Sequence, residues 1–490
     1  MKPRRAPAWR TALVAGILAT GAASIVILPP ARSTSRVVGS LGPSPGAAAQ
    51  QPIPGVAKGG SGPRKVATGG VQGADPVEAA ACAAGRNGGA TDVGVTASTI
   101  KLGATVVDSG IGASFLRDAR YGMIAVKDAV NRRGGVCGRK LELVLKDDGW
   151  NYRVGGEHIR SLVEDSKVFA LAVVPSSEGL KNVSDGGYLR KKGVPVVGSD
   201  GMLIHQYSDP YIWPVAASTI STMHIMAQQA YDAGARHFGI VYEHTYHFGL
   251  EGAYAFNAAV KRLTGSDIPG YSNPMTDPKC DERFCGIADE QASYGTEIQT
   301  FNNSCQTGVR CDFVALLLEP STAINWMTSG AIAPADGFRM GGPQPLFTRA
   351  FAQECGARCH DLWLWTGYDP PIGGNLGRPA IAEYVDAVNS AGSSADSTNT
   401  FVEGAYVGMS MLVQALERTG PDLTRTNLIR VLDSMDFSIG LAPGLSWRAG
   451  NHFANTRMQA WSIQYKDRFS GWRDQRVAMN DPWVGMDIPK

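Results

Sequence analysis

The sequence lacks aromatic residues over a long N-terminal stretch. No Trp, Tyr or Phe occurs between Trp9 and Phe115, and residues 29–91 consist largely of Gly, Ala, Pro and Ser. Such a segment cannot bury enough apolar area to offset the entropy that it would lose on ordering. We therefore expect residues 29–91 to form a flexible linker rather than a folded domain.

Familiar catalytic motifs are absent as well. The sequence contains no Gly-x-Ser-x-Gly elbow, no His-Glu-x-x-His zinc motif and no phosphate-binding loop with its lysine. At residues 198–201 a glycine directly precedes the serine, which is not the spacing of an elbow. His244 and His247 form His-x-x-His beside Glu243, but no third metal ligand is evident. We expect a protein that is not an enzyme and that needs no cofactor or metal.

Acidic residues are absent from one end of the chain. Residues 1–36 hold six basic side chains and no acidic one, whereas residues 37–490 hold 40 Lys and Arg against 44 Asp and Glu. This mildly acidic body argues against nucleic acid as the main partner. With 490 residues, of which 44% are hydrophobic, the chain is long enough for two or three domains.

The basic N-terminus continues into the one long apolar run of the sequence. Residues 2–10 are rich in Lys and Arg, and residues 12–28 form a 17-residue apolar run. This combination is typical of an export signal, but the run is slightly short for a membrane-spanning helix of about 20 residues. Residues 1–28 are thus either a cleaved signal peptide or a retained membrane anchor. Both place the body outside the cytoplasm, in the cell envelope or secreted.

The cysteines agree with export. They are Cys82, Cys137, Cys280, Cys285, Cys305, Cys311, Cys355 and Cys359. An even number in an exported chain favours disulfide bonds. Close spacing predicts that Cys280 bonds Cys285, Cys305 bonds Cys311 and Cys355 bonds Cys359, which leaves Cys82 for Cys137. The absence of Cys-x-x-Cys disfavours the rival zinc site.

From residue 100 onwards, short apolar segments alternate with longer amphipathic ones. Strands are predicted at residues 100–107, 141–146, 169–174, 238–241, 313–318, 346–348, 362–366, 459–466 and 469–474. Helices are predicted at residues 119–131, 156–165, 222–233, 249–263, 322–331, 380–391, 401–418 and 425–435, and a cysteine-containing loop at 277–312. This alternation is typical of parallel sheets covered by helices.

The order of several short motifs resembles a known family. The motifs are Ile100-Lys101-Leu102-Gly103, Arg139-Lys140-Leu141-Glu142-Leu143, Val194-Pro195-Val196, Phe238-Gly239-Ile240-Val241-Tyr242 and Tyr246-His247-Phe248-Gly249. Over residues 100–474 the chain resembles the extracytoplasmic solute-binding proteins of ABC importers, of the branched-chain amino-acid and amide type. The resemblance implies an α/β fold with two doubly wound parallel-sheet lobes joined by three crossovers. Lobe 1 would comprise residues 92–217 plus 368–438, and lobe 2 residues 218–367 plus 439–490.

The resemblance also implies a function. The two lobes would close on a small polar solute and deliver it to an ABC permease in the membrane. The solute would be an amino acid, an amide or a related nitrogen compound. Two other functions fit the same sequence: a membrane-tethered sensor, favoured by a retained N-terminal helix, and an extracytoplasmic hydrolase assembled from distant residues.

Serines at two strand ends are the first candidate ligand contacts. Ligands of parallel sheets bind beyond the carboxyl ends of the strands, and free N–H groups at a helix start favour an anion. Ser176, Ser177 and Ser199 occupy such positions, and the resemblance places a ligand carboxylate there. Asp200 adds negative charge beside Ser199 and weakens the case for a carboxylate. Helix capping is the plain alternative role for these serines.

The remaining candidates come from other loops. The resemblance places Tyr246 against the amino end of the ligand, where an aromatic face attracts a cation, and assigns Glu319 to an ammonium or amide group. Glu319 could instead cap the helix that follows it. Tyr368, Trp150 and Ser109 lie on a crossover or on loops after strands and are further candidates. Replacing Glu319 and Tyr246 together by Ala is expected to abolish binding without unfolding the protein.

Overall fold

The computed structural model describes residues 87–173, 175–330, 332–466, 469–474 and 479–480. The chain divides into two units, Met1–Lys65 and Val66–Lys490, and the described residues all belong to the second. The predicted export segment, nearly all of the predicted linker, and Cys82 lie outside the described residues. Within the described part, no helix combines the length and the apolar character that crossing a bilayer requires.

The first sheet is parallel and has the strand order β2-β1-β3-β4-β5. Its strands are β1 (Thr99–Val106), β2 (Lys140–Asp147), β3 (Ala170–Ala172), β4 (Val196–Ser199) and β5 (Ile212–Pro214). The helices between them are α2 (Ala113–Leu116), α3 (Ala119–Arg132), α4 (Tyr152–Glu164), α5 (Ser177–Asp185), α6 (Tyr188–Lys192) and α7 (His205–Ser208). The three inner strands are almost wholly buried, which explains why most of their residues are apolar or small.

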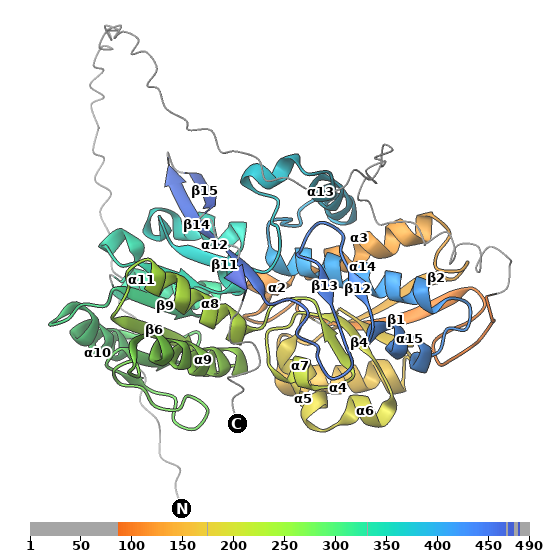
Figure 1. The fold of residues 1–490 in the computed structure, drawn as a ribbon, viewed down its shortest axis with the longest axis horizontal. Helices are drawn as coiled ribbons and strands as arrows, with labels where there is room; N and C mark the ends of the chain where they lie inside the picture. Colours follow the sequence, from red (N-terminus) through yellow and green to blue (C-terminus); the bar gives the residue numbers. More distant parts are fainter. Residues whose placement is uncertain (1–86, 174, 331, 467–468, 475–478, 481–490) are drawn as a thin grey trace, which may run out of the picture. The chain divides into compact units, whose positions relative to one another are not determined.

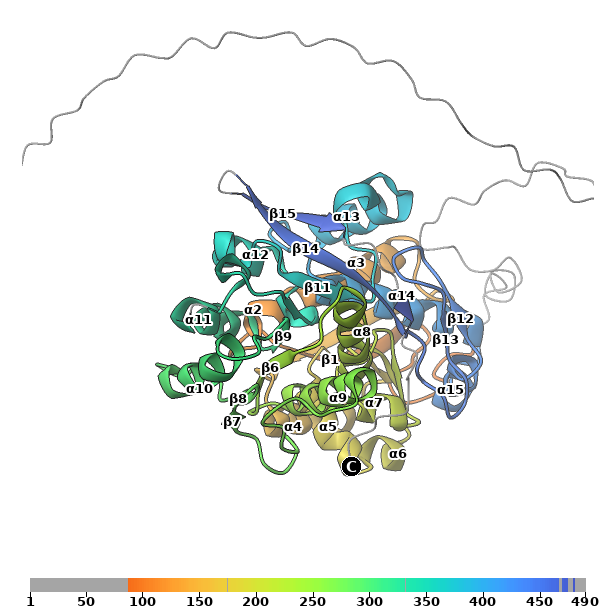
Figure 2. The same ribbon diagram turned by 60° about the vertical axis from the view of Figure 1, so that its left-hand side comes forward.

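The second sheet has the order β15-β14-β11-β10-β9-β6-β8-β7, and β16 pairs with β14. Its parallel strands are β6 (Phe238–Glu243), β8 (Phe284–Ile287), β9 (Phe313–Leu317), β10 (Met340–Gly342) and β11 (Trp363–Thr366). Its antiparallel strands are β7 (Cys280–Asp281), β14 (Arg457–Lys466), β15 (Phe469–Asp474) and β16 (Met479–Asn480). The helices are α8 (Thr219–Asp232), α9 (His247–Thr264), α10 (Gly295–Gln306), α11 (Pro320–Gly330) and α12 (Arg349–Cys355). Figure 2 shows β14 and β15 beside β11.

After β11 the chain returns to the first sheet. It forms α13 (Pro379–Ala391), α14 (Thr400–Thr419), α15 (Arg425–Leu432) and the hairpin of β12 (Asp436–Phe437) and β13 (Leu445–Ser446). Helix α14 packs on α3 and β4 (Figure 1). This packing needs glycine, because a Cβ on Gly198 would lie 2.5 Å from the Cα of Gly408. The α/β fold with two mainly parallel sheets and three crossovers, at residues 215–218, 367–378 and 447–456, is therefore as expected.

We call the first sheet with its packed helices, including α13–α15, lobe 1, and the second sheet with α8–α12 lobe 2. Two expectations about lobe 2 were wrong. The strand predicted at residues 346–348 is absent: residues Gln344–Leu346 form a 3-10 helix, η2, and the strand lies earlier, at β10. Two glycines in β10 hid the strand pattern, and Pro343 and Pro345 remove backbone donors after it. The predicted loop at 277–312 contains β7, β8 and α10.

The disulfides form in the three close pairs that the spacing favoured. They join Cys280 to Cys285, Cys305 to Cys311, and Cys355 to Cys359. Cys137 is also disulfide-bonded, while Cys82, its expected partner, lies outside the described residues. All three local bonds belong to lobe 2, where they close loops that connect its strands and helices.

A single buried side chain ties the three crossovers together. Asn455, 1% exposed, donates from Nδ2 to the carbonyl oxygens of Val215 (3.2 Å) and Gly367 (3.1 Å). These carbonyls belong to the other two crossovers. Because a buried carbonyl without a partner is costly, this amide fixes the three segments relative to one another.

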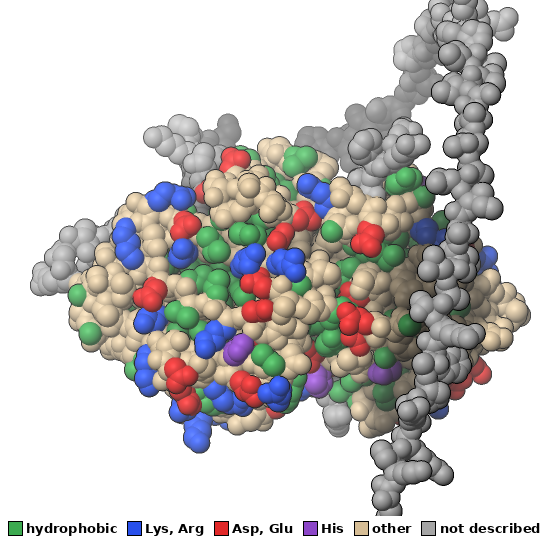
Figure 3. Space-filling model, turned by 180° about the vertical axis from the view of Figure 1, so that it is seen from behind, with side chains coloured by type: hydrophobic (Ala, Val, Ile, Leu, Met, Phe, Trp, Pro, Cys, Tyr) green, Lys and Arg blue, Asp and Glu red, His purple; other side chains and the backbone are tan. Residues whose placement is uncertain are grey.

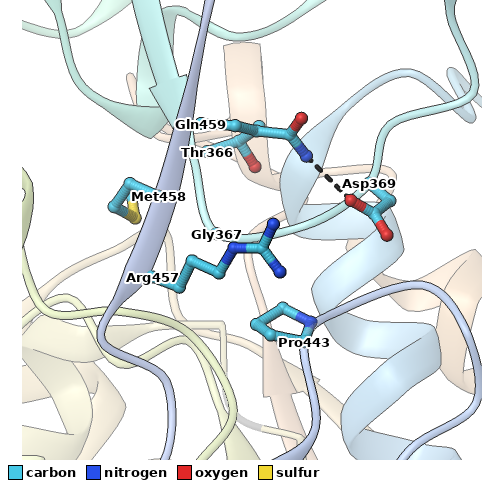
Figure 4. Close-up of a pocket in the computed structure, with 7 residues that line it drawn as sticks. All are labelled: Thr366, Gly367, Asp369, Pro443, Arg457, Met458 and Gln459. Carbon is cyan, nitrogen blue, oxygen red and sulfur yellow. Dashed lines mark hydrogen bonds between the residues drawn. The ribbon is translucent and has the colours of Figure 1, made fainter. Parts of the chain in front are cut away.

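A second polar group lies beside the crossovers. Asp369 forms an ion pair with Arg378 at 2.7 Å and accepts a hydrogen bond from Gln459 Nε2 at 2.9 Å (Figure 4). The side chain of Arg457 points into a cavity of only ≈ 10 Å³ next to this group. The polar groups at the crossovers are thus largely satisfied by one another.

Candidate functional site

Trp150 is the centre of the contact between the two lobes. It follows β2 and is 1% exposed. Its ring stacks on Tyr246 of lobe 2 with centroids 4.2 Å apart and meets Phe115 edge to face at 5.2 Å. Phe248 at the start of α9 closes the other side, at 5.5 Å. An aromatic cluster from both lobes therefore fills the region beyond the strand ends.

Hydrogen bonds hold Trp150 in this place. Its backbone N–H donates to Asp148 Oδ1 at 2.9 Å, and its indole Nε1 donates to Ser177 Oγ at 3.4 Å. The backbone of Trp150 has φ = +60°, a conformation that L side chains rarely adopt. Trp150 thus lies between Ser177 and Tyr246, where the family resemblance places a ligand.

The structure brings the predicted serines to the same region. Ser176 and Ser177 begin α5 and are fully buried, and Ser176 makes no capping bond with its side chain. The Ser176 hydroxyl has no hydrogen-bond partner among the described residues. Ser199 ends β4, also fully buried, and its Oγ has no hydrogen-bond partner among the described residues. Capping therefore does not account for Ser176 or Ser199.

Two buried carboxyls accompany these serines. Asp148 is 2% exposed, and burial raises its pKa to about 6. Asp200 is 7% exposed, and burial raises its pKa to about 7. Asp200 Oδ1 accepts hydrogen bonds from Gln206 Nε2 at 2.6 Å and from the N–H of Met202 at 3.2 Å. Both carboxyls are held by neutral donors, so burial is the dominant influence on their protonation.

A small cavity lies between the lobes next to Asp200. Its volume is ≈ 10 Å³, and it is lined by Val173, Pro175, Gly198, Asp200, Gln344, Tyr368, Thr400, Phe401, Gly404 and Ala405. The predicted residue Tyr368 is thus placed at this site. Gln344 Nε2 and Thr400 Oγ1 have no hydrogen-bond partner among the described residues, although both side chains are at least 95% buried. The cavity has room for about one water molecule.

Sequence reasoning missed Gln344, Thr400 and Asp148. Gln344 was hidden because its segment was assigned to a loop before a strand that does not exist. Thr400 was hidden because it is the first residue of a long apolar helix, α14. Asp148 could have been found, since it directly follows a predicted strand in the same way as Ser176 follows β3.

Glu319 has the alternative role, that of a helix cap. Its carboxylate accepts from the N–H of Ser321 at 2.9 Å and also from the N–H of Thr322 and the hydroxyl of Ser321. Its own N–H donates to Glu243 Oε1 at 3.0 Å. Burial, together with the nearby Glu319, raises the pKa of Glu243 well above its usual value. Glu319 therefore stabilises the start of α11, and its replacement is expected to lower the stability of the protein.

Ser109 and His247 lie at the edges of the site. Ser109 is exposed on the loop after β1, where it hydrogen-bonds the Asp147 carboxylate. His247 belongs to lobe 2, but its Nδ1 is 2.6 Å from Glu178 Oε2 and its N–H donates to Glu178 Oε1 at 2.8 Å. Glu178 belongs to α5 of lobe 1, so this pair joins the lobes. No group of three metal-ligating side chains occurs in the described part of the chain.

Surface charge is mixed. On the face shown in Figure 3, Lys and Arg side chains are interspersed with Asp and Glu.

Several solved structures share this fold. A solute-binding protein of an ABC transporter from Rhodopseudomonas palustris HaA2, in complex with p-hydroxybenzoic acid, has a TM-score of 0.65 at 17% identity, over 79% of this chain and 99% of that one. A branched-chain amino acid transporter substrate-binding protein from Streptococcus pneumoniae, in complex with isoleucine, has a TM-score of 0.61 at 15% identity, over 78% and 100%. A fatty acid ABC transporter substrate-binding protein from Thermomonospora curvata has a TM-score of 0.63 at 18% identity, over 80% and 95%.

Family membership follows from the sequence itself. No curated protein matches the chain. The family described as periplasmic binding protein matches residues 99–468, which include the first sheet, the second sheet except β15 and β16, and the aromatic cluster. Members of this family bind ligands and are not enzymes. The chain belongs to the periplasmic binding protein family.

Proposed function

We propose that this protein captures a small nitrogen-containing solute between its two lobes, outside the cytoplasm, and delivers it to an ABC permease. The convergence of Trp150 and Ser177 from lobe 1 with Tyr246 from lobe 2 carries the proposal. The structural neighbours named above support it, since they are described as solute-binding proteins of transporters. Residues 1–28 would direct export. The lobes would have the boundaries expected from the sequence, except that the third boundary would fall in the crossover at residues 447–456 and not between residues 438 and 439.

Binding would act through a shift between open and closed lobes. The cavity of ≈ 10 Å³ is far below the several hundred Å³ of a typical ligand pocket. A solute would therefore enter when the lobes separate and would take up the space that the Trp150 ring now occupies. The ring would then contact the solute instead of stacking fully on Tyr246.

The test is thermal unfolding of the oxidised full chain against amino acids, amides, urea-like compounds, polyamines and sugars. A solute at about 100 times its Kd should stabilise the folded state by about 2.7 kcal/mol. Tyr246→Ala should abolish the shift, whereas Tyr254→Ala on the same helix, α9, should retain it. Absence of any shift across the panel would contradict the proposed function.

A further inference from the structure

We infer that the solute presents a neutral primary carboxamide or urea-type group, and not a carboxylate, to Asp200, Gln344 and Thr400. This inference rests on the proposed function and names the solute class. The three residues line the same cavity between the lobes. Asp200 follows β4 and Thr400 begins α14, both in lobe 1, whereas Gln344 begins η2 in lobe 2. A group bound by all three would therefore hold the lobes together.

The ionised form of Asp200 disfavours a carboxylate ligand. Asp200 is buried in the cavity wall, and its Oδ1 accepts hydrogen bonds from an amide side chain and a backbone N–H. Arg139 and Arg283 are the only buried Arg or Lys side chains in the described part of the chain. Both donate to backbone carbonyls elsewhere, Arg139 to Thr96 and Arg283 to Ser304. A ligand carboxylate would meet Asp200 without a balancing cation, which is costly in a buried site.

The free hydrogen-bonding groups match a carboxamide. A carboxylate has about four acceptor sites, so Asp200 can accept from a ligand N–H in addition to Gln206 and Met202. The unpartnered Nε2 of Gln344 can donate to a ligand carbonyl oxygen, and the unpartnered Thr400 hydroxyl can accept or donate. A carboxamide or urea offers an N–H donor and a carbonyl acceptor side by side. An ammonium group offers donors only and would leave Gln344 Nε2 without a partner.

The rest of the site suits an apolar or aromatic body. Tyr368 and Phe401 line the cavity next to the polar groups. The Phe401 ring lies 5.5 Å from Phe115, which in turn contacts Trp150. The aromatic cluster is thus continuous with the polar cavity, and a solute could place its amide at Asp200 and its body against the rings.

The experiment compares solutes that differ only in the head group. Two series serve: 4-hydroxybenzamide, 4-hydroxybenzoate and 4-hydroxybenzylamine, and isobutyramide, isobutyrate and isobutylamine. Urea and the amino acids complete the set. Calorimetric titration of the full chain should give amides an affinity at least about tenfold higher than the matching acids and amines, because the wrong head group leaves a buried polar group unpaired.

The possible outcomes distinguish a failure of the carboxamide inference from a failure of the proposed function. Tighter binding of the acids, or of amino acids with no response to amides or urea, overturns the carboxamide inference and leaves the proposed function standing. Tighter binding of the amines also overturns it. No binding by any of these compounds counts against both.

Matched variants locate the head group. Asp200→Asn removes the charge but keeps the size, and should raise the affinity for the acid relative to the amide by about tenfold. Asp232→Asn is the control, since Asp232 is exposed on α8 and bonds Gln228, and it should leave the preference unchanged. Gln344→Glu should lower amide affinity about tenfold and favour the amine. If Asp200→Asn and Gln344→Glu both fold, as shown by their unfolding curves, and both keep the head-group preference of the wild type, the assignment of the head group to these residues is overturned.

Discussion

The crossovers and the inter-lobe cavity are adjacent, but they treat buried polar groups in opposite ways. At the crossovers, Asn455 uses its amide on two carbonyls, and Asp369 is held by Arg378 and Gln459. In the cavity, Gln344 Nε2 and Thr400 Oγ1 have no partner among the described residues. Tyr368 connects the two regions, since it precedes Asp369 and lines the cavity.

The difference separates buried polar side chains that stabilise the fold from buried polar side chains that are available to bind a ligand. Buried polar atoms in native proteins are nearly always paired, because an unpaired one costs about 1–3 kcal/mol. Unpaired buried polar atoms occur at several places among the described residues, but those of Asp200, Gln344 and Thr400 line one cavity between the two lobes. Four predictions test this division, in order of decreasing effect.

The largest effect concerns the pH dependence of stability. Burial raises the pKa of Asp200 from its usual 3.8 to about 7. The folded protein therefore binds this proton more tightly than the unfolded chain, so the associated stability is present below about pH 4 and is lost as pH rises through about 7. The ligand-free protein should lose on the order of 4 kcal/mol between those limits from Asp200 alone. Urea unfolding of Asp200→Asn should show a flatter pH profile than wild type, and an identical profile would contradict a buried, unbalanced carboxyl.

Breaking the crossover amide should come next. Asn455→Ala leaves the carbonyls of Val215 and Gly367 without their donor, and the free energy of unfolding should fall by about 2–4 kcal/mol. Chemical denaturation measures this loss. Asn427→Ala in α15, where the side chain is partly exposed and bonds Asp422 locally, is the control and should change stability little. If Asn455→Ala were as stable as wild type, the hydrogen bonds at the crossovers would not stabilise the fold, and the contrast with the cavity would fail.

Glu319→Ala should have a smaller effect, again on stability. Loss of the cap at α11 should destabilise the protein by about 1–2 kcal/mol, as measured by thermal unfolding. Glu319→Gln should recover part of this loss, because an amide oxygen can still accept from the first N–H groups of the helix. If Glu319→Ala were fully stable yet unable to bind solute, Glu319 would be a ligand residue and not a cap.

The smallest effect is expected where the lobes touch at their edge. His247→Ala removes the side-chain contact with Glu178 but keeps the backbone N–H that the same carboxylate accepts. A partly exposed pair of this kind contributes up to about 1 kcal/mol, so solute affinity should fall by at most about fivefold. His237→Ala, which breaks a pair with Asp312 inside lobe 2, should leave affinity unchanged. A greater loss of affinity in the control would show that the contact between lobes is irrelevant.

Much of the fold could be predicted because local sequence controls it. The apolar run at 313–318 became β9 (Phe313–Leu317), and the amphipathic segment at 401–418 became α14. The first is a continuous apolar run, which suits a fully buried strand, and the second has apolar residues at the spacing of a helix. The strand at β10 escaped prediction because two of its three residues are glycine and its stability comes from pairing with β9 and β11.

The site was predicted in part. The rule that ligands bind beyond parallel strand ends led to Ser176, Ser177, Trp150 and Tyr246, and the structure brings these together. The same rule led to Glu319, which turned out to be a cap, because a strand end and a helix start are the same place in a βα unit. Sequence position alone cannot tell a carboxylate that faces a ligand from one that bonds its own helix.

By itself, the sequence determined the fold class, the export-like N-terminus, the close disulfide pairs and the strand ends at which a ligand would bind. These are consequences of residue type and short-range spacing. Only the tertiary structure decided that Trp150 fills the space between the lobes, that Asn455 ties three crossovers and that Gln344 and Thr400 share a cavity with Asp200. Each of those facts joins residues that are far apart in the sequence or depends on which polar atoms remain unpaired after packing, and the local pattern of the chain determines neither.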